Sequence, residues 1–341
     1  MFNNSWFKKE KPLPTMIGMG GGATGLSWSG PTAPTFTATG GTTSEAGGWK
    51  FHYFTSPGPN PFVVSDTPIP GSHFVLVAGG GSGCGGYGSG GGGGGVVYSN
   101  GTYEIEMGSW TVNIGDGGAA PSGSGNLTQR RGVSGSDSTF VFPTVTITAK
   151  GGGGGRWTPD TSPWVPSTPP AGGSSGGGAG TPNLVQTATQ PTQNPGIPTL
   201  TNAGHAGGNA PGWPGPGGGG GGGAGGVGTA GPPTKAGDGG PGLGPPTWSW
   251  LPTSFFHNGY AAGGGGGSSY YGTGNSEPGD APPDGTGGGG PSPVNSDGGS
   301  GQTNSGGGGA GANQPEPGQP AYTNQGGSGG PGAMVIAYPL G

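Results

Sequence analysis

The residue types that most often carry out catalysis are few in this chain, and their spacing fits no catalytic arrangement. The four histidines, His52, His73, His205 and His257, have no ligand-like spacing with one another or with the single cysteine, Cys84. Cys84 lies in GSGCGGYG, where a small buried filler is a better interpretation than a nucleophile. The sequence therefore predicts no metal site and allows no disulfide within the chain.

Serines and aspartates next to glycine imitate two functional motifs. GGSSG at 172–176 and GGSGG at 326–330 satisfy G-x-S-x-G, but a nucleophile elbow needs a following helix with His and acidic partners. Asp116, Asp238 and Asp297 each begin a D-G-G triplet, but the short period of calcium-binding glycine repeats is missing. We interpret these aspartates as turn residues, and we expect neither an enzyme nor a cofactor.

Aromatic side chains outside the expected strands are the residues best suited to binding. They lie in loops, at Trp157, Trp164, Trp213, Trp248, Trp250, Phe255, Phe256, Tyr260, Tyr270, Tyr271 and Tyr322. Rigid rings on loops supply contact area at low entropic cost and can stack on sugar faces. The alternative is that they cover the backbone of the scaffold, which we expect for about half of them.

The segment 245–260, PPTWSWLPTSFFHNGY, is the first candidate for a receptor-binding loop because it holds four aromatic residues within nine positions. The 156–164 loop is the second candidate. The residues that we expect to contact a receptor are Trp157, Trp164, Trp248, Trp250, Phe255, Phe256, His257, Tyr260, Tyr270 and Tyr271.

These loops interrupt a chain that is dominated by glycine. It has 96 Gly and 39 Pro among 341 residues, and 7% of its residues are charged. The purest tract is GGGGGGGAGG at 217–226, and shorter ones lie at 90–95 and 151–155. Such tracts have no side chains to bury and a large backbone ordering cost. They are therefore either disordered or packed backbone against backbone, and we take the second alternative.

Collagen is excluded as the form of packing because Gly does not recur at every third position. The remaining solution is a bundle of extended, left-handed, threefold helices of the polyproline II type, made of glycine. Such helices have no internal hydrogen bonds, so their N–H and C=O groups must pair with neighbouring helices. Proline suits the loops because it prefers the same φ and prevents an α-helix.

Four stretches predict β-strands beside the tracts. WKFHYF at 49–54 alternates and indicates one covered face, whereas HFVLVAGGG at 73–81 indicates a strand covered on both faces. TVTITAK at 144–150 runs directly into a glycine tract. GAMVIAYPLG at 332–341 is an apolar strand that we expect to return to the sheet.

A hairpin is predicted at 102–118. Tyr103, Ile105 and Met107 alternate with polar residues, and the phase reverses after Gly108-Ser109. A two-residue turn there would pair Met107 with Trp110, Ile105 with Val112 and Tyr103 with Ile114. One side of this hairpin would be wholly apolar.

The expected fold class is all-β plus polyglycine II: a small antiparallel β-sheet or sandwich fused to a bundle of polyglycine II helices with irregular Pro/aromatic loops and no α-helix. The expected parts are an N-terminal attachment arm (1–30), a β-sheet region (31–150), the bundle with its loops (151–331) and the returning strand (332–341). The arm offers Trp6, Phe7, Lys8, Lys9, Met16 and Ile17 for docking.

Charge and hydropathy limit the partners. The net charge is −5 without a basic patch, so nucleic acid is not expected as a target. No apolar run approaches the roughly 20 residues of a membrane span, so membrane insertion is not expected either. The start, MFNNSWFKKEKPLP, lacks the apolar region of a signal peptide, so we expect no cleaved leader.

The strand-flanked motifs resemble a known group of proteins. HFVLVAGGGSGCGG, VVYSNGTYEIEMGSWTVNIGDGG, TVTITAKGGGGG and GGPGAMVIAYP are similar to glycine-rich proteins of bacteriophage tails, especially in phages of marine bacteria. FKKEKPLPTMIGMGGGATGL resembles the N-terminal attachment segment of virion proteins in such phages. The alternation of tracts and loops resembles the polyglycine II tail-fibre-tip adhesins of some T-even-like phages.

This resemblance implies a virion appendage, either a tail-fibre protein or a tip adhesin, in the tail or on the capsid surface. The arm would bind other virion proteins, and the loops would bind a host-cell glycan or outer-membrane protein. A homotrimer is one possible assembly, although a single chain could complete a bundle alone. The alternatives are a structural capsid or tail decoration protein without its own receptor and, more remotely, an ice-binding protein, for which regular Thr/Ala rows are missing.

Overall fold

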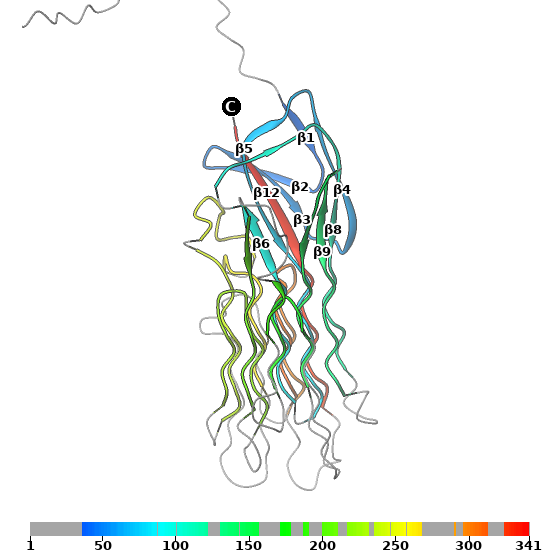
Figure 1. Ribbon diagram of the computed structural model, residues 1–341, viewed down its shortest axis with the longest axis vertical. Helices are drawn as coiled ribbons and strands as arrows, with labels where there is room; N and C mark the ends of the chain where they lie inside the picture. Colours follow the sequence, from blue (N-terminus) through cyan, green and yellow to red (C-terminus); the bar gives the residue numbers. More distant parts are fainter. Residues whose placement is uncertain are drawn as a thin grey trace, which may run out of the picture. The chain divides into compact units, whose positions relative to one another are not determined.

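The computed structural model describes residues 36–86, 88–99, 101–121, 130–142, 144–156, 171–178, 187–190, 200–210, 217–231, 235–245, 247–256, 258–267, 290, 296–312 and 324–340, and the statements below concern these residues. They form twelve β-strands and no α-helix, so the chain is all-β as the sequence predicts (Figure 1). Within this part, no helix is long and apolar enough to cross a membrane.

The strands form two antiparallel sheets. The order in the first sheet is β1 (Thr37–Thr39), β4 (Gly58–Ser65), β8 (Gly108–Ile114), β9 (Ser138–Val141) and β10 (Thr146–Ala149). The order in the second sheet is β11 (Leu200–Ala203), β6 (Val96–Ser99), β5 (Ile69–Val77), β12 (Ala333–Pro339), β3 (Trp49–Phe54) and β2 (Thr42–Ala46), and β7 (Tyr103–Ile105) also pairs with β5.

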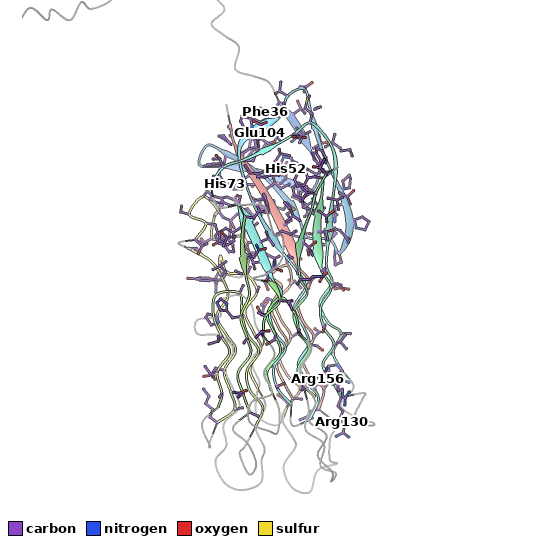
Figure 2. The ribbon with its side chains drawn as sticks, in the orientation of Figure 1. Phe36, His52, His73, Glu104, Arg130 and Arg156 are labelled. Atoms are coloured by element: carbon purple, nitrogen blue, oxygen red, sulfur yellow. The ribbon has the colours of Figure 1, made fainter. Side chains whose placement is uncertain are left out.

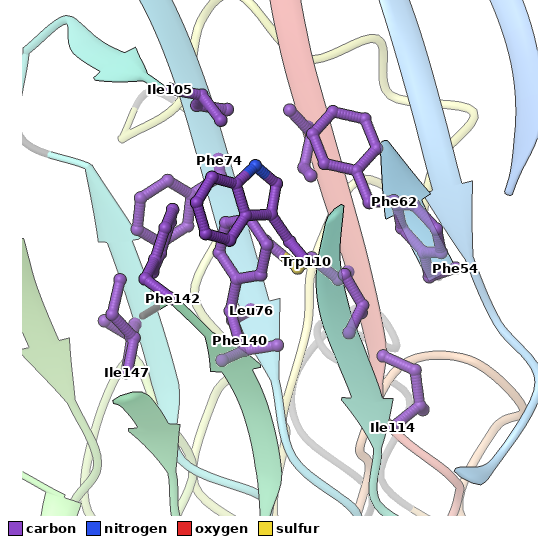
Figure 3. Packing of buried hydrophobic residues seen from close by; sticks show 14 of the residues in the cluster. Phe54, Phe62, Phe74, Leu76, Ile105, Trp110, Ile114, Phe140, Phe142 and Ile147 are labelled. Atoms are coloured by element: carbon purple, nitrogen blue, oxygen red, sulfur yellow. The ribbon is translucent and has the colours of Figure 1, made fainter. Parts of the chain in front are cut away.

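A hydrophobic core joins the two sheets (Figure 3). The first sheet contributes Phe62, Trp110 and Phe140, and the second contributes Phe74 and Leu76, all at most 4% exposed. The Phe140 ring centroid lies 6.4 Å from that of Phe62 and 6.1 Å from that of Phe74 in edge-on contacts, a geometry that favours aromatic pairs. The sheets therefore form a sandwich, which is the arrangement expected for the strand-rich region.

The predicted strands at 73–81 and 332–341 are confirmed. β5 directs Phe74 and Leu76 into the sandwich core and Val75 and Val77 to the opposite, equally buried face. β12 lies between β5 and β3, with Val335 opposite both Val75 and Tyr53. The C-terminal segment thus returns to the centre of the sheet. β10 confirms the strand predicted within 144–150 and forms an edge of the first sheet.

The prediction of one covered face at 49–54 is wrong. Residues 49–54 form β3, but Phe54 packs in the sandwich core while Phe51 packs on the opposite face, and His52 is fully buried. The second cover comes from the distant segment 244–262. Alternation along one strand cannot reveal a cover that is supplied by another part of the chain.

The predicted hairpin at 102–118 is also wrong. Tyr103–Ile105 pairs with β5 in the second sheet, whereas Gly108–Ile114 pairs with β4 and β9 in the first. Gly108 and Ser109 begin β8 and form no hairpin turn, and Met107 is 53% exposed. The apolar phase is right nevertheless, because Ile105, Trp110, Val112 and Ile114 face the same core from two sheets.

Glycine tracts continue directly from the strands. β5 leads into 78–86, which turns back through 88–95 into β6, and β8 leads into 115–121 (Figure 1). Each of these tracts thereby begins or ends at a strand of the sandwich. β11 was not predicted, because LTNA at 200–203 lacks an apolar pattern; it extends the second sheet at the edge next to β6.

Hydrogen bonds between the tracts repeat every three residues. The tract 78–85 donates N–H groups to three neighbouring segments. The first series of bonds runs to 89–95, from Ala78 to Gly95, Gly81 to Gly92 and Cys84 to Ser89. The second runs to 130–136, from Gly79 to Ser136, Ser82 to Val133 and Gly85 to Arg130, and the third runs to 327–330, from Gly80 to Gly330 and Gly83 to Gly327. These N···O distances are 2.8–3.2 Å. Successive residues thus donate to three different neighbouring segments in turn, and each of these segments runs antiparallel to 78–85.

The tract at 219–224 has the same period. Its donors address the segments 175–178, 226–229 and 262–265 in rotation, with N···O distances of 2.8–3.1 Å. A β-strand has a period of two and pairs with neighbours on two sides only. A period of three with pairing in three directions is what a threefold extended helix requires. The tracts therefore have the hydrogen-bond pattern that the predicted polyglycine II helices require.

Close backbone approach explains why the tracts are glycine. A Cβ added at Gly83, Gly220 or Gly221 would lie within 3.0 Å of a carbonyl oxygen of a neighbouring tract. Real Cβ atoms essentially never come so close to backbone atoms. Alanine is nevertheless present at a few tract positions, including Ala224 and Ala310, which are fully buried or nearly so.

Two adjacent glycines, Gly177 and Gly178, allow a test of packing by backbone contact. A methyl group at Gly177 would collide with the backbone of Gly219, whereas one at Gly178 has its nearest neighbour 3.5 Å away, at the Ala210 nitrogen. We expect Gly177→Ala to lower the free energy of unfolding by about 1–3 kcal/mol, as overpacking does. Gly178→Ala should leave it unchanged or raise it by up to about 1 kcal/mol. Denaturant titration of both variants measures the difference, and equal losses would contradict packing by backbone contact.

The buried His52 predicts a pH dependence of stability. Its Nδ1 lies 2.7 Å from the Gly40 carbonyl oxygen and its Nε2 lies 3.0 Å from the Tyr338 hydroxyl, which suits a neutral ring that donates to one and accepts from the other. Burial lowers the pKa of His52, and burial also lowers that of His73. The unfolded chain then binds more protons than the folded one below about pH 6.5.

We therefore expect the free energy of unfolding to fall as the pH drops from 7 to 5. His52→Gln should remove much of that slope, and a double variant with His73→Gln should remove more. Urea denaturation at a series of pH values measures it. A slope that is the same in the double variant as in the unchanged protein would contradict the assignment.

Candidate functional site

The segment 244–262, which contains the first candidate receptor-binding loop (245–260), packs on the outer face of the second sheet. Trp248 is 1% exposed, and its ring lies among Tyr98 and Phe256 at centroid distances of 5.6 and 6.0 Å. Phe255 lies on Tyr53 at 4.0 Å, and Trp250 stacks on His73 at 5.1 Å. The segment thus covers the sheet at the end where Figure 2 labels His73.

The candidate residues differ in what they present to solvent. Trp248 is buried, and its Nε1 donates to the Gly259 carbonyl at 3.3 Å, so it supports the fold and not the surface. Trp250, Phe255, Phe256 and Tyr260 are half-buried and keep part of each ring accessible. The covering role that the sequence allowed for part of the aromatic set is therefore present in this loop.

The other candidates lie outside the described residues. They are Trp157, Trp164, His257, Tyr270 and Tyr271 of the predicted receptor-binding set and Trp6, Phe7, Lys8, Lys9, Met16 and Ile17 of the predicted attachment arm.

Unusual backbone conformations gather in and around this segment. The described residues other than glycine with positive φ are Asp66, Phe256, Asn258, Ala262 and Asn304, and three of them belong to 244–262. Phe256 has φ of 53°, which is a strained value for a bulky residue. Such strain persists only where the surroundings enforce it, and it is frequent at binding sites.

A hollow of about 480 Å³ opens beside Phe255 and Phe256. The start of β12 and the aromatic residues Tyr53, Phe255 and Phe256 give it an apolar side. Its polar side consists of Thr42, Thr55, Ser254, Gln302, Thr303 and Asn304. None of the lining residues is charged, so the hollow suits a neutral ligand with both apolar and hydroxyl surfaces.

The polar turn at 302–305 was missed in the sequence. The letters QTNS interrupt two glycine runs, which is a turn pattern that contains an Asn able to take positive φ. Asn304 has φ of 58°, and Ser305 Oγ donates to the Gln302 carbonyl at 2.8 Å. Attention to polar interruptions of glycine runs could have identified this half of the hollow.

Serines and aspartates of the motif-like sequences accept hydrogen bonds from backbone N–H groups. Ser174 and Ser175, from GGSSG, are fully buried and accept hydrogen bonds from the N–H groups of His205 and Gly207. Asp116 accepts a hydrogen bond from the Gly117 N–H within an extended tract, and Asp297 accepts one from the distant Gln325 N–H, so these bonds do not confirm the expected role as turn residues. Within the described part, no three His, Cys, Asp or Glu residues are placed to hold a metal ion.

Arg130 and Arg156 lie at the end of the tracts away from the sandwich (Figure 2), and Cys84 contacts Arg130 there. The Cys84 thiol is fully buried and donates to the Arg130 carbonyl at 2.8 Å, and burial raises its pKa to about 12. A thiol that remains protonated is a poor nucleophile, in agreement with the interpretation of Cys84 as a filler. Burial lowers the pKa of Arg156, and the neighbouring charge of Arg131 adds to this effect.

Segments that are distant in sequence meet at the far end. The Gly85 N–H donates to the Arg130 carbonyl, and the Ala312 N–H donates to the Cys84 carbonyl. The tracts thereby bring sequence positions that lie far apart to one end of the bundle.

Comparison with known proteins gives a family but no characterised relative. A search of the curated proteins finds no match to this chain. The model of the glycine-rich domain family matches residues 66–339, which include β5 to β12 and all the described glycine tracts that follow. The chain therefore belongs to the glycine-rich domain family.

Proposed function

We propose that this protein is a bacteriophage virion appendage, a tail-fibre protein or tip adhesin, whose loops bind a receptor on the host cell. The observation that carries the proposal is the three-directional hydrogen bonding of the tracts. Backbone bonds in three directions make a rigid scaffold that depends on no loop residue. Binding proteins use such frameworks because loop sequences can then change without loss of the fold.

The ends of the tracts support this division between scaffold and loops. Buried tract positions such as Gly92 and Gly221 admit no side chain, whereas Arg130 and Arg156 appear where the tracts end. Side-chain diversity is thus confined to the connections. The resemblance of the strand-flanked motifs to phage tail proteins supplies the biological setting of the proposal.

The partners follow from the same assignment. The arm at 1–30 would bind other virion proteins, and the loops would bind a host glycan or an outer-membrane protein. The described tracts pair with one another within a single chain, so a homotrimer is not required to complete them.

A decoration protein without a receptor is the second candidate. The observation that favours it is the packing of 244–262 on the sheet, because this loop, which has the most aromatic residues, buries Trp248 in the core. In that case the aromatic residues would cover the scaffold, and the protein would form a structural layer on the virion without binding a receptor.

Labelled protein separates the two functions. We expect the purified full chain to label host cells at micromolar concentration and to block infection. Replacement of Trp157 and Trp164 by Ala should weaken labelling about tenfold or more, because two aromatic contacts are lost. The matched control is Met107→Ser, a change of a residue that is 53% exposed in the sandwich, and it should label cells normally.

Two results would contradict receptor binding by these loops. Protein that stays in virions but labels no host cell at micromolar concentration would favour decoration. An unchanged host range after exchange of both the 156–170 and the 268–285 loops would overturn receptor binding by these loops.

A further inference from the structure

The hollow between the 244–262 segment and the 302–305 turn has the dimensions of a ligand site. Its volume of about 480 Å³ lies within the range of small-molecule pockets. It is built by five separate parts of the chain: the start of β2, the end of β3, the segment around Phe255, the turn at Gln302 to Asn304 and the start of β12. A space shaped by five segments is held by the fold as a whole.

Its lining combines two kinds of surface. Phe255 and Phe256 are half-buried, and Phe255 lies on Tyr53 with ring centroids 4.0 Å apart, which fixes its orientation. Among the polar lining residues, Thr42, Thr55, Gln302 and Thr303 are exposed, and their side chains make no hydrogen bond within the described residues. These hydroxyl and amide groups can therefore both donate to and accept from a ligand.

The walls are fixed before a ligand arrives. Ser305 is buried and bridges its own turn, because its Oγ donates to the Gln302 carbonyl and accepts from the Gly307 N–H at 3.2 Å. On the other wall, the Phe255 N–H donates to the Pro252 carbonyl at 3.1 Å. A site that is already ordered loses little entropy when it binds.

Backbone strain supports a role for the same two walls. Phe256 and Asn304, one on each wall, are both held at positive φ. Asn takes this conformation readily, but Phe does so at a cost. The fold therefore maintains an unfavourable conformation where a ring borders the hollow.

The absence of charge in the lining decides the class of ligand. A phosphate, a carboxylate or a basic peptide would enter this hollow without a compensating charge, which is costly for a desolvated ion. A purely apolar ligand would leave the hydroxyl and amide groups without partners. A lining that combines aromatic rings with neutral hydrogen-bonding groups matches a sugar ring, which has C–H faces and a rim of hydroxyl groups.

We propose that this hollow binds a neutral saccharide, through stacking against the Phe255–Phe256 wall and hydrogen bonds to Thr42, Gln302 and Thr303. The site lies at the sandwich, away from the far end of the tracts where Arg130 and Arg156 lie, and it does not depend on the virion assignment.

Ligand-observed NMR on the full chain tests the site with a panel of neutral mono- and disaccharides, and glucuronic acid serves as the charged comparison. We expect at least one neutral sugar to receive saturation from the protein and its ring protons to shift upfield, as protons over an aromatic face do. Calorimetry then gives the affinity. Thr42→Ala and the pair Gln302→Ala and Thr303→Ala should each weaken it about tenfold, the effect of a lost hydrogen bond.

A neighbouring residue gives the matched control. Thr43 follows Thr42 in β2 and is equally exposed, but successive strand residues point to opposite faces and Thr43 does not line the hollow. Thr43→Ala should therefore bind like the unchanged chain. Thermal unfolding of every variant shows whether a loss of binding is a loss of fold.

Three outcomes overturn the proposal: no neutral sugar binds at tens of millimolar; glucuronic acid binds as well as the neutral sugars; or Thr42→Ala and Thr43→Ala bind alike. Sugar binding in the absence of cell labelling would leave this inference standing and overturn only the adhesin function.

Discussion

The structure depends on contact between main chains that have no Cβ atoms between them. In the tracts, successive N–H groups donate to different neighbouring segments, and a Cβ added at most of the glycines would collide with the backbone of a neighbour. Backbone groups that would otherwise be buried without partners are satisfied in this way, so hydrogen bonding takes the part that apolar side chains take in an ordinary core. This also limits the sequence more severely than a hydrophobic core does, because many apolar residues of similar volume can replace one another, whereas most of these glycines leave no room for a side chain.

The glycine tracts alone do not define their own register, and the sandwich supplies it. A glycine helix carries no side chain to set its register, and a shift by three residues would restore the same hydrogen-bond pattern. The strands do carry such information: Phe74 and Leu76 fix β5 in the sandwich core, and the chain then continues into 78–86. In the same way Met334 fixes β12 at the end of 326–332. The hydrophobic effect thus aligns the tracts from one end, and the backbone bonds hold them together beyond it.

The sequence predicts local elements well here and long-range pairing poorly. The strands at 73–77 and 333–339 could be found because they are buried on both faces and read as continuous apolar runs. The hairpin at 102–118 failed because its apolar phase is shared by two strands of different sheets that face one core. His52 was assigned to an open face because its cover, like the cover of Phe51, comes from elsewhere in the chain. The hollow depends on Thr42, Phe256 and Asn304 together, and no local pattern connects three positions that lie so far apart.

The two ends of the tracts face different requirements. At the sandwich, loops must fit an existing apolar surface, and 244–262 does so by burying Trp248 and Leu251 against the second sheet. Its sequence is therefore constrained by packing, and whatever it recognises has to be read by the parts of Phe255 and Phe256 that remain exposed. At the far end the tracts offer little apolar surface, because Gly85, Gly177 and their neighbours are bare backbone. A loop there gains little by packing on the tracts and is free to vary. Substitutions are therefore expected to be more tightly constrained in 244–262 than at the far end of the tracts.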